Sequence, residues 1–172
     1  APVSGGSWGA ENGTLSIMAG GSDEAYTRCI PVFEAMGKTL VHCGPVGAGQ
    51  SAKLVNQVVG AVNLEAVCEG VLLAAQSAAR WEDVWKAVSA GASASWAWTN
   101  LAPRVHAEDF APGFKIDHMA KDLRLALEAA GRVKLSLPGV SLVLHHIQQL
   151  QDEGRGQEGT QALITALRQA QS

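Results

Sequence analysis

The sequence predicts a mainly α-helical fold built on one long helix and preceded by a short α/β segment. Aliphatic residues and alanine raise the hydrophobic fraction of the 172 residues to 47%, whereas aromatic residues make up only 5%. This composition favours packed helices over a β-sandwich or barrel. Residues 49–80 contain no proline and are dense in leucine and valine, which predicts the long helix. A chain of this length can bury a substantial core as one domain, or as one domain and a fragment.

Residues 1–45 carry the pattern of the trailing edge of an α/β sheet. Residues 14–19 (TLSIMA) alternate enough for a short strand, and Ser22 is placed to cap a helix that begins with Asp23 and Glu24. We expect that helix to be interrupted at Pro31 and to stop at Gly37, before a second strand at residues 39–43 (TLVHC). The order is therefore strand, helix, strand.

Residues 46–172 show helical patterns only and are expected to form a second, all-helical domain. The long helix would measure about 45 Å at 1.5 Å per residue. Because it is apolar on nearly every side, it needs cover from other helices or from a partner subunit. The turn residues predict shorter helices at residues 82–89, 95–101, 117–130, 138–152 and 160–170.

Charge and cysteine usage exclude several classes of function. Thirteen Lys and Arg against 16 Asp and Glu give a net charge of −3, which disfavours binding to nucleic acid or through a polybasic patch to membranes. No uninterrupted apolar stretch reaches the roughly 20 residues of a membrane span, and the first residues do not resemble a signal peptide. The three widely spaced cysteines and five scattered histidines form no metal-ligand pattern. We therefore expect a soluble, cytoplasmic protein with reduced cysteines and no metal site.

A glycine-rich turn at residues 44–49 (GPVGAG) opens the long helix and precedes the most distinctive polar group. The turn reads GxxGxG and lacks both the GxGxxG order of dinucleotide folds and a following GK[ST], so it is weak as a phosphate site. Lys53 lies one turn into the helix, with Asn56 and Gln57 three and four residues later on the same face. A half-buried ammonium can serve as a general acid or base. The alternative is a lysine that reaches along the surface to solvent.

Two further segments are candidate binding elements. Ser4, Gly5 and Gly6 combine a hydroxyl with exposed backbone N–H groups, which suits a carboxylate, although a frayed terminal loop is the alternative. Lys121 and Asp122 are neighbours on a predicted helix, where such a pair is usually a solvated edge.

Four stretches together resemble the β-hydroxyacid dehydrogenase family, close to 3-hydroxyisobutyrate dehydrogenase and tartronate semialdehyde reductase. They are, in order, APVSGG, GTLSIMAGG, EAMGKTLVHCGPVGAGQSAKLVNQ and FAPGFKIDHMAKDLRLALEAA. The resemblance covers nearly the whole chain. It implies an NAD- or NADP-dependent enzyme that interconverts a short hydroxyacid and its oxo acid or semialdehyde by hydride transfer.

The resemblance also assigns roles to individual residues. Lys53 would be the catalytic general acid and base, and the loop of Ser4, Gly5 and Gly6 would bind the substrate carboxylate. Asn56 would be the first amide after the lysine, but many members place the functional asparagine one residue later, at Gln57. Which of these two amides reaches the substrate stays open at this point.

Lys121 matches a lysine that closes over the nicotinamide cofactor, and Phe114 lies on the loop before it. Trp96 falls where members line the substrate pocket, a weaker match. Family members have a nucleotide-binding domain with GxGxxG, which these residues do not contain, so the cofactor would be bound mainly outside this chain. On its own the chain is therefore expected to be inactive.

Two alternatives remain beside the enzyme. A helical domain with one long apolar helix could serve only in dimerisation, and family members pair through this domain, so a homodimer or higher oligomer is expected. The resemblance also extends to imine reductases, but these usually replace the lysine with aspartate or tyrosine. Lys53 therefore favours a hydroxyacid substrate.

Overall fold

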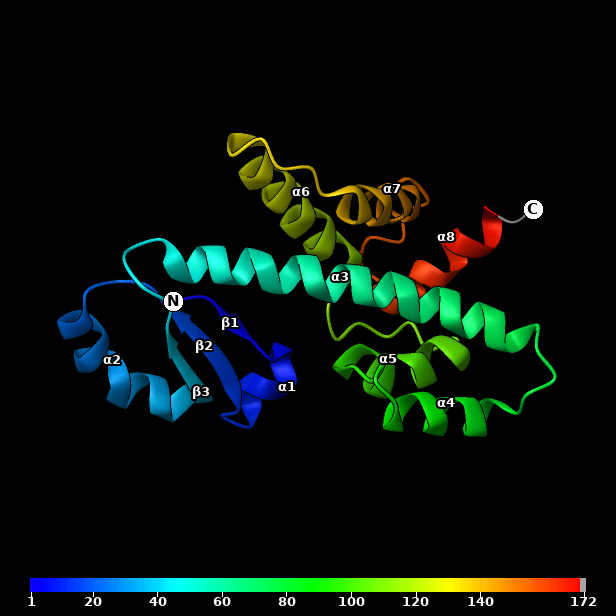
Figure 1. The fold of residues 1–172 in the computed structure, drawn as a ribbon, viewed down its shortest axis with the longest axis horizontal. Helices are drawn as coiled ribbons and strands as arrows, with labels where there is room; N and C mark the ends of the chain where they lie inside the picture. The colour runs from blue at the N-terminus through cyan, green and yellow to red at the C-terminus, as the bar shows by residue number, and fades with distance from the viewer. Residues whose placement is uncertain (171–172) are drawn as a thin grey trace. The chain divides into compact units, whose positions relative to one another are not determined.

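Alternating apolar side chains make residues 15–19 the central strand of a small sheet. The computed structural model describes residues 1–170, and residues 171–172 lie outside the described part. The chain divides into two units, Ala1–Asn56 and Gln57–Ser172. In the first unit the sheet order is β1 (Val3–Ser4), β2 (Leu15–Ala19) and β3 (Gly37–His42). β1 pairs antiparallel with β2, whereas β2 and β3 are parallel (Figure 1).

Two helices accompany this sheet, α1 (Gly6–Glu11) and α2 (Asp23–Met36). Ser22 caps α2 as predicted, because its Oγ accepts a hydrogen bond of 3.2 Å from the Ala25 N–H. The expected interruption at Pro31 is wrong, since α2 continues through Pro31 to Met36. A proline inside a helix removes one backbone hydrogen bond, and here that loss does not end the helix. β1 and α1 were not predicted, because two strand residues and a six-residue helix are too short to show a period.

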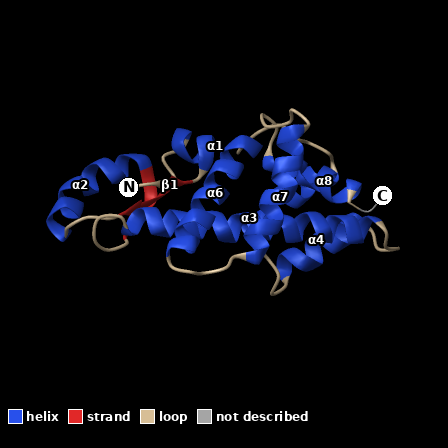
Figure 2. Ribbon diagram, turned by 90° about the horizontal axis from the view of Figure 1, so that it is seen from above, coloured by secondary structure: helices blue, strands red, loops and turns tan. Residues whose placement is uncertain are grey.

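The second unit is helical throughout. It contains the greater part of α3 (Ala48–Ala75), then α4 (Trp81–Ala90), α5 (Trp96–His106), α6 (Ile116–Arg132), α7 (Pro138–Asp152), the 3₁₀ turn η1 (Thr160–Ala162) and α8 (Leu163–Gln169). Within this unit, α6 and α7 lie on one side of α3, and α4 and α5 lie on the other (Figure 1). Figure 2 shows that, in the described part of the chain, strands occur only in the first unit. The predicted fold class, a helical unit after a short α/β segment, is confirmed.

Several helix ends differ from the prediction. The long helix ends at Ala75 and not near residue 80, and a turn follows in which the Ser77 hydroxyl donates to the Ala74 carbonyl at 2.8 Å. α5 continues through Pro103 to His106, whereas the expected helix ends at residue 101. The segment expected as one helix at residues 160–170 divides into η1 and α8.

The core of the helical unit is formed by side chains from α3, α5, α6, α7 and α8. Its largest fully buried members include Leu64, Leu123, Ile147, Leu150 and Leu163. Trp98 is also buried and donates its indole N–H to the Trp85 carbonyl at 3.2 Å. These contacts give the unit a core of its own.

Large apolar side chains on α3 remain exposed, so the chain does not cover this helix on every side. Within the helical unit they are Val59, Val62 and Leu73, of which Leu73 is 74% exposed. By length and composition alone α3 is long and apolar enough to cross a membrane, with a mean hydropathy of 1.7 over its most apolar window. Core helices of helical proteins meet the same criterion, and Leu64, Val67 and Val71 of α3 are core residues here.

A buried carboxyl group on α3 faces a histidine of α7. Glu65 Oε1 lies 2.8 Å from His146 Nδ1, and both side chains are almost fully buried. Burial raises the pKa of Glu65 above its usual value of 4.5, and the nearby Glu69 adds to the rise, whereas His146 opposes it. The ionised carboxylate is therefore less favourable in the folded state than in the unfolded chain.

This raised pKa predicts a loss of stability with rising pH. The folded state holds the Glu65 proton more tightly than the unfolded chain, so its contribution is full below about pH 4.5 and is lost as the pH rises through the folded pKa. Glu65→Gln should flatten this part of the decline in unfolding free energy, measured by urea titration between pH 4.5 and 8. Parallel pH curves for the wild type and the variant would contradict the prediction.

Candidate functional site

The start of α3 is held against the end of β2 by a close backbone approach. The Gly21 N–H donates to the Gly44 carbonyl at 2.9 Å, and the Ala48 N–H donates to the Pro45 carbonyl at 3.0 Å. A Cβ on Gly49 would lie 2.2 Å from the Met18 carbonyl oxygen. The glycine-rich turn of residues 44–49 therefore has a packing function, because it seats the helix on the strand.

This seating places the polar residues of the first turns of α3. Lys53 and Asn56 belong to the first unit, and both are half-buried. The intermediate exposure of Lys53 agrees with neither a fully buried ammonium nor a lysine standing in solvent. Both side chains take part in further interactions within the structure.

The Ser4–Gly5–Gly6 segment lies at the end of β1 and is ordered by strand pairing. Ser4 pairs with Ser16 of β2, and the next two residues have φ angles of +138° and +63°. These left-handed values favour glycine, and a Cβ on Gly5 would also lie 3.0 Å from the Leu15 side chain. The segment is therefore a defined turn into α1 and not a frayed end.

In the helical unit the structure brings Gln57, Lys121 and Asp122 together. Gln57 Nε2 donates to Asp122 Oδ2 at 2.6 Å, and Lys121 Nζ lies 3.0 Å from Asp122 Oδ1. The Asp122 side chain is 15% exposed, whereas that of Lys121 is 65% exposed. The expectation of a solvated edge therefore holds for the lysine and is wrong for the aspartate.

The other predicted residues of this unit lie around the start of α6 and α5. Phe114 is 36% exposed on the loop before α6, and its ring centroid lies 5.9 Å from that of His118. Trp96, the weak candidate for the substrate pocket, is 71% exposed at the start of α5. No group of three or more His, Cys, Asp or Glu side chains suited to a metal ion occurs within residues 1–170.

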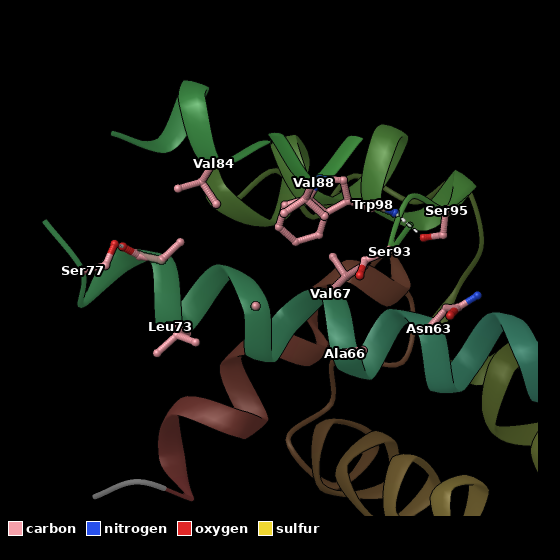
Figure 3. Close-up of a pocket in the computed structure, with 12 residues that line it drawn as sticks. Asn63, Ala66, Val67, Leu73, Ser77, Val84, Val88, Ser93, Ser95 and Trp98 are labelled. Carbon is pink, nitrogen blue, oxygen red and sulfur yellow. Dashed lines mark hydrogen bonds between the residues drawn. The ribbon is translucent and has the colours of Figure 1, made fainter. Parts of the chain in front are cut away.

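A groove of about 530 Å³ in the helical unit is not where the candidates gather. It lies between α3 and the α4–α5 region, with Val84, Val88 and Trp98 facing Val67 across it (Figure 3). Its polar lining consists of Asn63, Ser77, Ser93 and Ser95, and none of the predicted site residues is among its lining residues.

Comparison with known proteins places this arrangement in a family. The family model described as NAD-binding of NADP-dependent 3-hydroxyisobutyrate dehydrogenase matches residues 47–167, and that described as NAD binding domain of 6-phosphogluconate dehydrogenase matches residues 1–44. An uncharacterized oxidoreductase of Synechocystis is 45% identical over 170 residues, which cover 99% of this chain and 58% of the relative. The 2-hydroxy-3-oxopropionate reductase of Escherichia coli is 39% identical over 167 residues, which cover 97% and 57%.

A solved structure supports the same grouping. The 3-hydroxyisobutyrate dehydrogenase of Mycobacterium tuberculosis, determined with L-serine, has a TM-score of 0.89 at 32% identity, covering 98% of this chain and 60% of that chain. This chain thus spans about three fifths of the length of these relatives. It belongs to the family of 3-hydroxyisobutyrate dehydrogenase, the β-hydroxyacid dehydrogenases, as the resemblance of its motifs implied.

Proposed function

We propose that the protein containing this chain is a soluble NAD(P)-dependent dehydrogenase that interconverts a short hydroxyacid and the corresponding semialdehyde or oxo acid. The observation that supports the proposal is Lys53, which is half-buried on α3. The resemblance of the motifs matches this residue to the lysine of the family. Supporting names among the relatives are 3-hydroxyisobutyrate dehydrogenase and 2-hydroxy-3-oxopropionate reductase. A substrate like 3-hydroxyisobutyrate is therefore the first to be tested.

In this reaction Lys53 moves a proton at the substrate oxygen. The nicotinamide cofactor, when bound, supplies or accepts the hydride at the substrate carbon. In reduction, the Lys53 ammonium donates a proton to the carbonyl oxygen as the C–H bond forms, which gives the alcohol. In oxidation, neutral Lys53 removes the hydroxyl proton. A lysine suits both directions, because its ammonium can donate a proton and its neutral amine can accept one.

The remaining candidate residues of the first unit and of α3 would bind and orient the substrate. The turn of Ser4, Gly5 and Gly6 would hold the substrate carboxylate, since its left-handed glycines fold it sharply at the end of a paired strand. Asn56 and Gln57 would contact the substrate through their amides. Each is half-buried on α3.

Lys121 and Phe114 fit a role at the cofactor, because each presents a group toward solvent that a bound dinucleotide could cover. Lys121 offers a largely exposed ammonium, and Phe114 offers a partly exposed ring. We propose that residues 1–45 form the trailing segment of the nucleotide-binding domain and residues 46–172 the substrate and dimerisation domain. The spans of the two family models, 1–44 and 47–167, support this division.

Association through α3 accompanies the proposal. Val59, Val62 and Leu73 leave an apolar stripe on α3 exposed in the single chain, which favours a homodimer or higher oligomer. The exposed apolar stripe would also be explained by a competing function, dimerisation without catalysis.

An assay of the intact gene product decides between the dehydrogenase and a domain that dimerises without catalysis. A panel of short hydroxyacids, tested with NAD and with NADP, should show turnover with at least one acid, and light scattering of the same preparation should give the mass of two or more chains. An oligomer that reduces or oxidises none of the acids would support the non-catalytic function. A monomer with full turnover would remove the association proposal alone.

A further inference from the structure

We propose that Gln161 is a positioning residue of the proposed dehydrogenase, which fixes the loop of residues 109–114 before α6 and with it the ring of Phe114. These residues are called the Phe114 loop below. The inference rests on the proposed function, because the role at the cofactor belongs to Phe114. Gln161 itself lies in η1 and is 1% exposed, so it acts on a ligand only through the residues that it holds.

The Phe114 loop takes its hydrogen bonds from another part of the chain. It belongs to no helix or strand, and Pro112 has no N–H group to donate. The carbonyl groups of such a segment need partners from outside it or from water. Residues 159–161 supply donors to the carbonyl groups of residues 109, 110, 111 and 114.

The side chain of Gln161 provides two of these hydrogen bonds. Its Nε2 donates to the Asp109 carbonyl at 2.7 Å and to the Ala111 carbonyl at 2.9 Å. An amide NH₂ group carries two hydrogens, so one nitrogen can serve both carbonyls. The amide is also tightly packed, since a Cβ on Gly159 would lie 2.5 Å from Gln161 Oε1. Because the side chain is buried, water can replace these two bonds only if the loop opens.

The backbone beside Gln161 extends the same contact to Phe114. The Thr160 N–H donates to the Phe114 carbonyl at 2.9 Å. Gly159 and Lys115, the residue after Phe114, form an antiparallel bridge. The Gln161 amide and these backbone groups therefore make one continuous contact along the loop, which ends at the residue that carries the ring.

Burial alone does not fix Phe114, because its side chain is 36% exposed. Its position depends on the backbone that η1 holds. A contact residue that is already in place loses less conformational entropy when the ligand binds. We therefore expect the hold on the loop to affect cofactor affinity more than the chemical step.

The first experiment is Gln161→Met in the intact gene product, because methionine has a similar size and no donor. The KM for the cofactor should rise by about 2- to 10-fold, the range for one aromatic contact, while the KM for the acid stays near wild type. Ile147→Val is the control. It removes one methyl group from a fully buried side chain of α7, so it should lower the melting temperature and leave the KM for the cofactor unchanged.

A double variant shows whether Gln161 acts through the ring. Phe114→Ala should raise the KM for the cofactor, and adding Gln161→Met should raise it no further, because the ring that Gln161 positions is already gone. Two residues that support cofactor binding independently would give effects that multiply.

Hydrogen exchange measures the hold on the loop without any assay of activity. The Thr160 amide donates to Phe114 and the Gly159 amide to Phe110, so both report on the closed loop. In Gln161→Met these two amides should exchange roughly 5- to 100-fold faster, as expected when buried carbonyls lose a donor. In Ile147→Val their exchange should stay near wild type.

Gln161→Glu is a second variant, for use if the methionine protein does not fold. It keeps the shape of the side chain, and its protonated carboxyl group can donate one hydrogen bond, whereas its carboxylate can donate none. The defect in the KM for the cofactor should therefore be smallest at low pH and grow as the pH rises from 5 to 8. A defect that does not depend on pH would count against the role of the donor.

The outcomes separate this inference from the proposed function. An active enzyme in which Gln161→Met changes neither the KM for the cofactor nor the exchange of the two amides overturns the positioning role. So does a double variant whose effects multiply. A wild-type protein that turns over no hydroxyacid overturns the proposed function, and the exchange measurement then decides alone whether Gln161 holds the loop.

Discussion

Lys53→Ala should lower kcat of the intact enzyme by about 10² to 10⁴, the usual contribution of general acid–base catalysis. The affinity for the cofactor should change little, because the role proposed for Lys53 is at the substrate oxygen. Steady-state kinetics with cofactor and acid varied in turn would measure both effects. Lys38→Ala on β3 is the control, since it removes an exposed lysine of the same unit and should leave kcat unchanged.

Lys53→Arg separates proton transfer from charge. A guanidinium keeps the positive charge but does not release its proton near neutral pH, so this variant should not recover the activity that Lys53→Ala loses. If Lys53→Arg kept a near-wild-type kcat from pH 6 to 9, electrostatic positioning would replace the general-acid role.

Most of the helical unit could be predicted because its signals are local. The expected helix at residues 138–152 coincides with α7, which begins at Pro138, where the fixed φ of proline suits the first helical turn. The errors include two prolines at which the local rule for ending a helix does not hold. Pro31 and Pro103 read as helix breaks, yet both stand inside helices.

The candidate site was likewise predicted where its residues belong to a local motif and missed where they do not. Lys53 and the Ser4–Gly5–Gly6 turn were found from their motifs, and their roles stay predictions. Asp122 was missed, because its partner Gln57 lies 65 residues earlier and nothing in the local pattern joins them. The only signal was its position next to Lys121, and adjacent opposite charges on a helix usually share the solvent.

Gly49→Ala should destabilise the first unit by about 1 to 3 kcal/mol or more, the usual cost of overpacking. The added Cβ would meet the Met18 carbonyl oxygen at 2.2 Å and the Met18 carbonyl carbon at 3.0 Å. Both are backbone atoms, so no side chain can turn away, and α3 must move off the end of β2. Lys53 stands one turn further along α3, and a displacement of about 1 Å can lower a rate by about 10²-fold.

Gly60→Ala is the matched control on the same helix. Apart from the adjacent residues and the nearby backbone of α3 itself, no atom lies within 4 Å of a Cβ at Gly60. The substitution should therefore stabilise the protein by about 0.5 to 1 kcal/mol through the better helix propensity of alanine. Urea unfolding of the two variants measures the stability difference, and kcat of the intact enzyme measures the displacement of Lys53. A Gly49→Ala protein as stable and as active as Gly60→Ala would show that the contact with Met18 does not seat the helix.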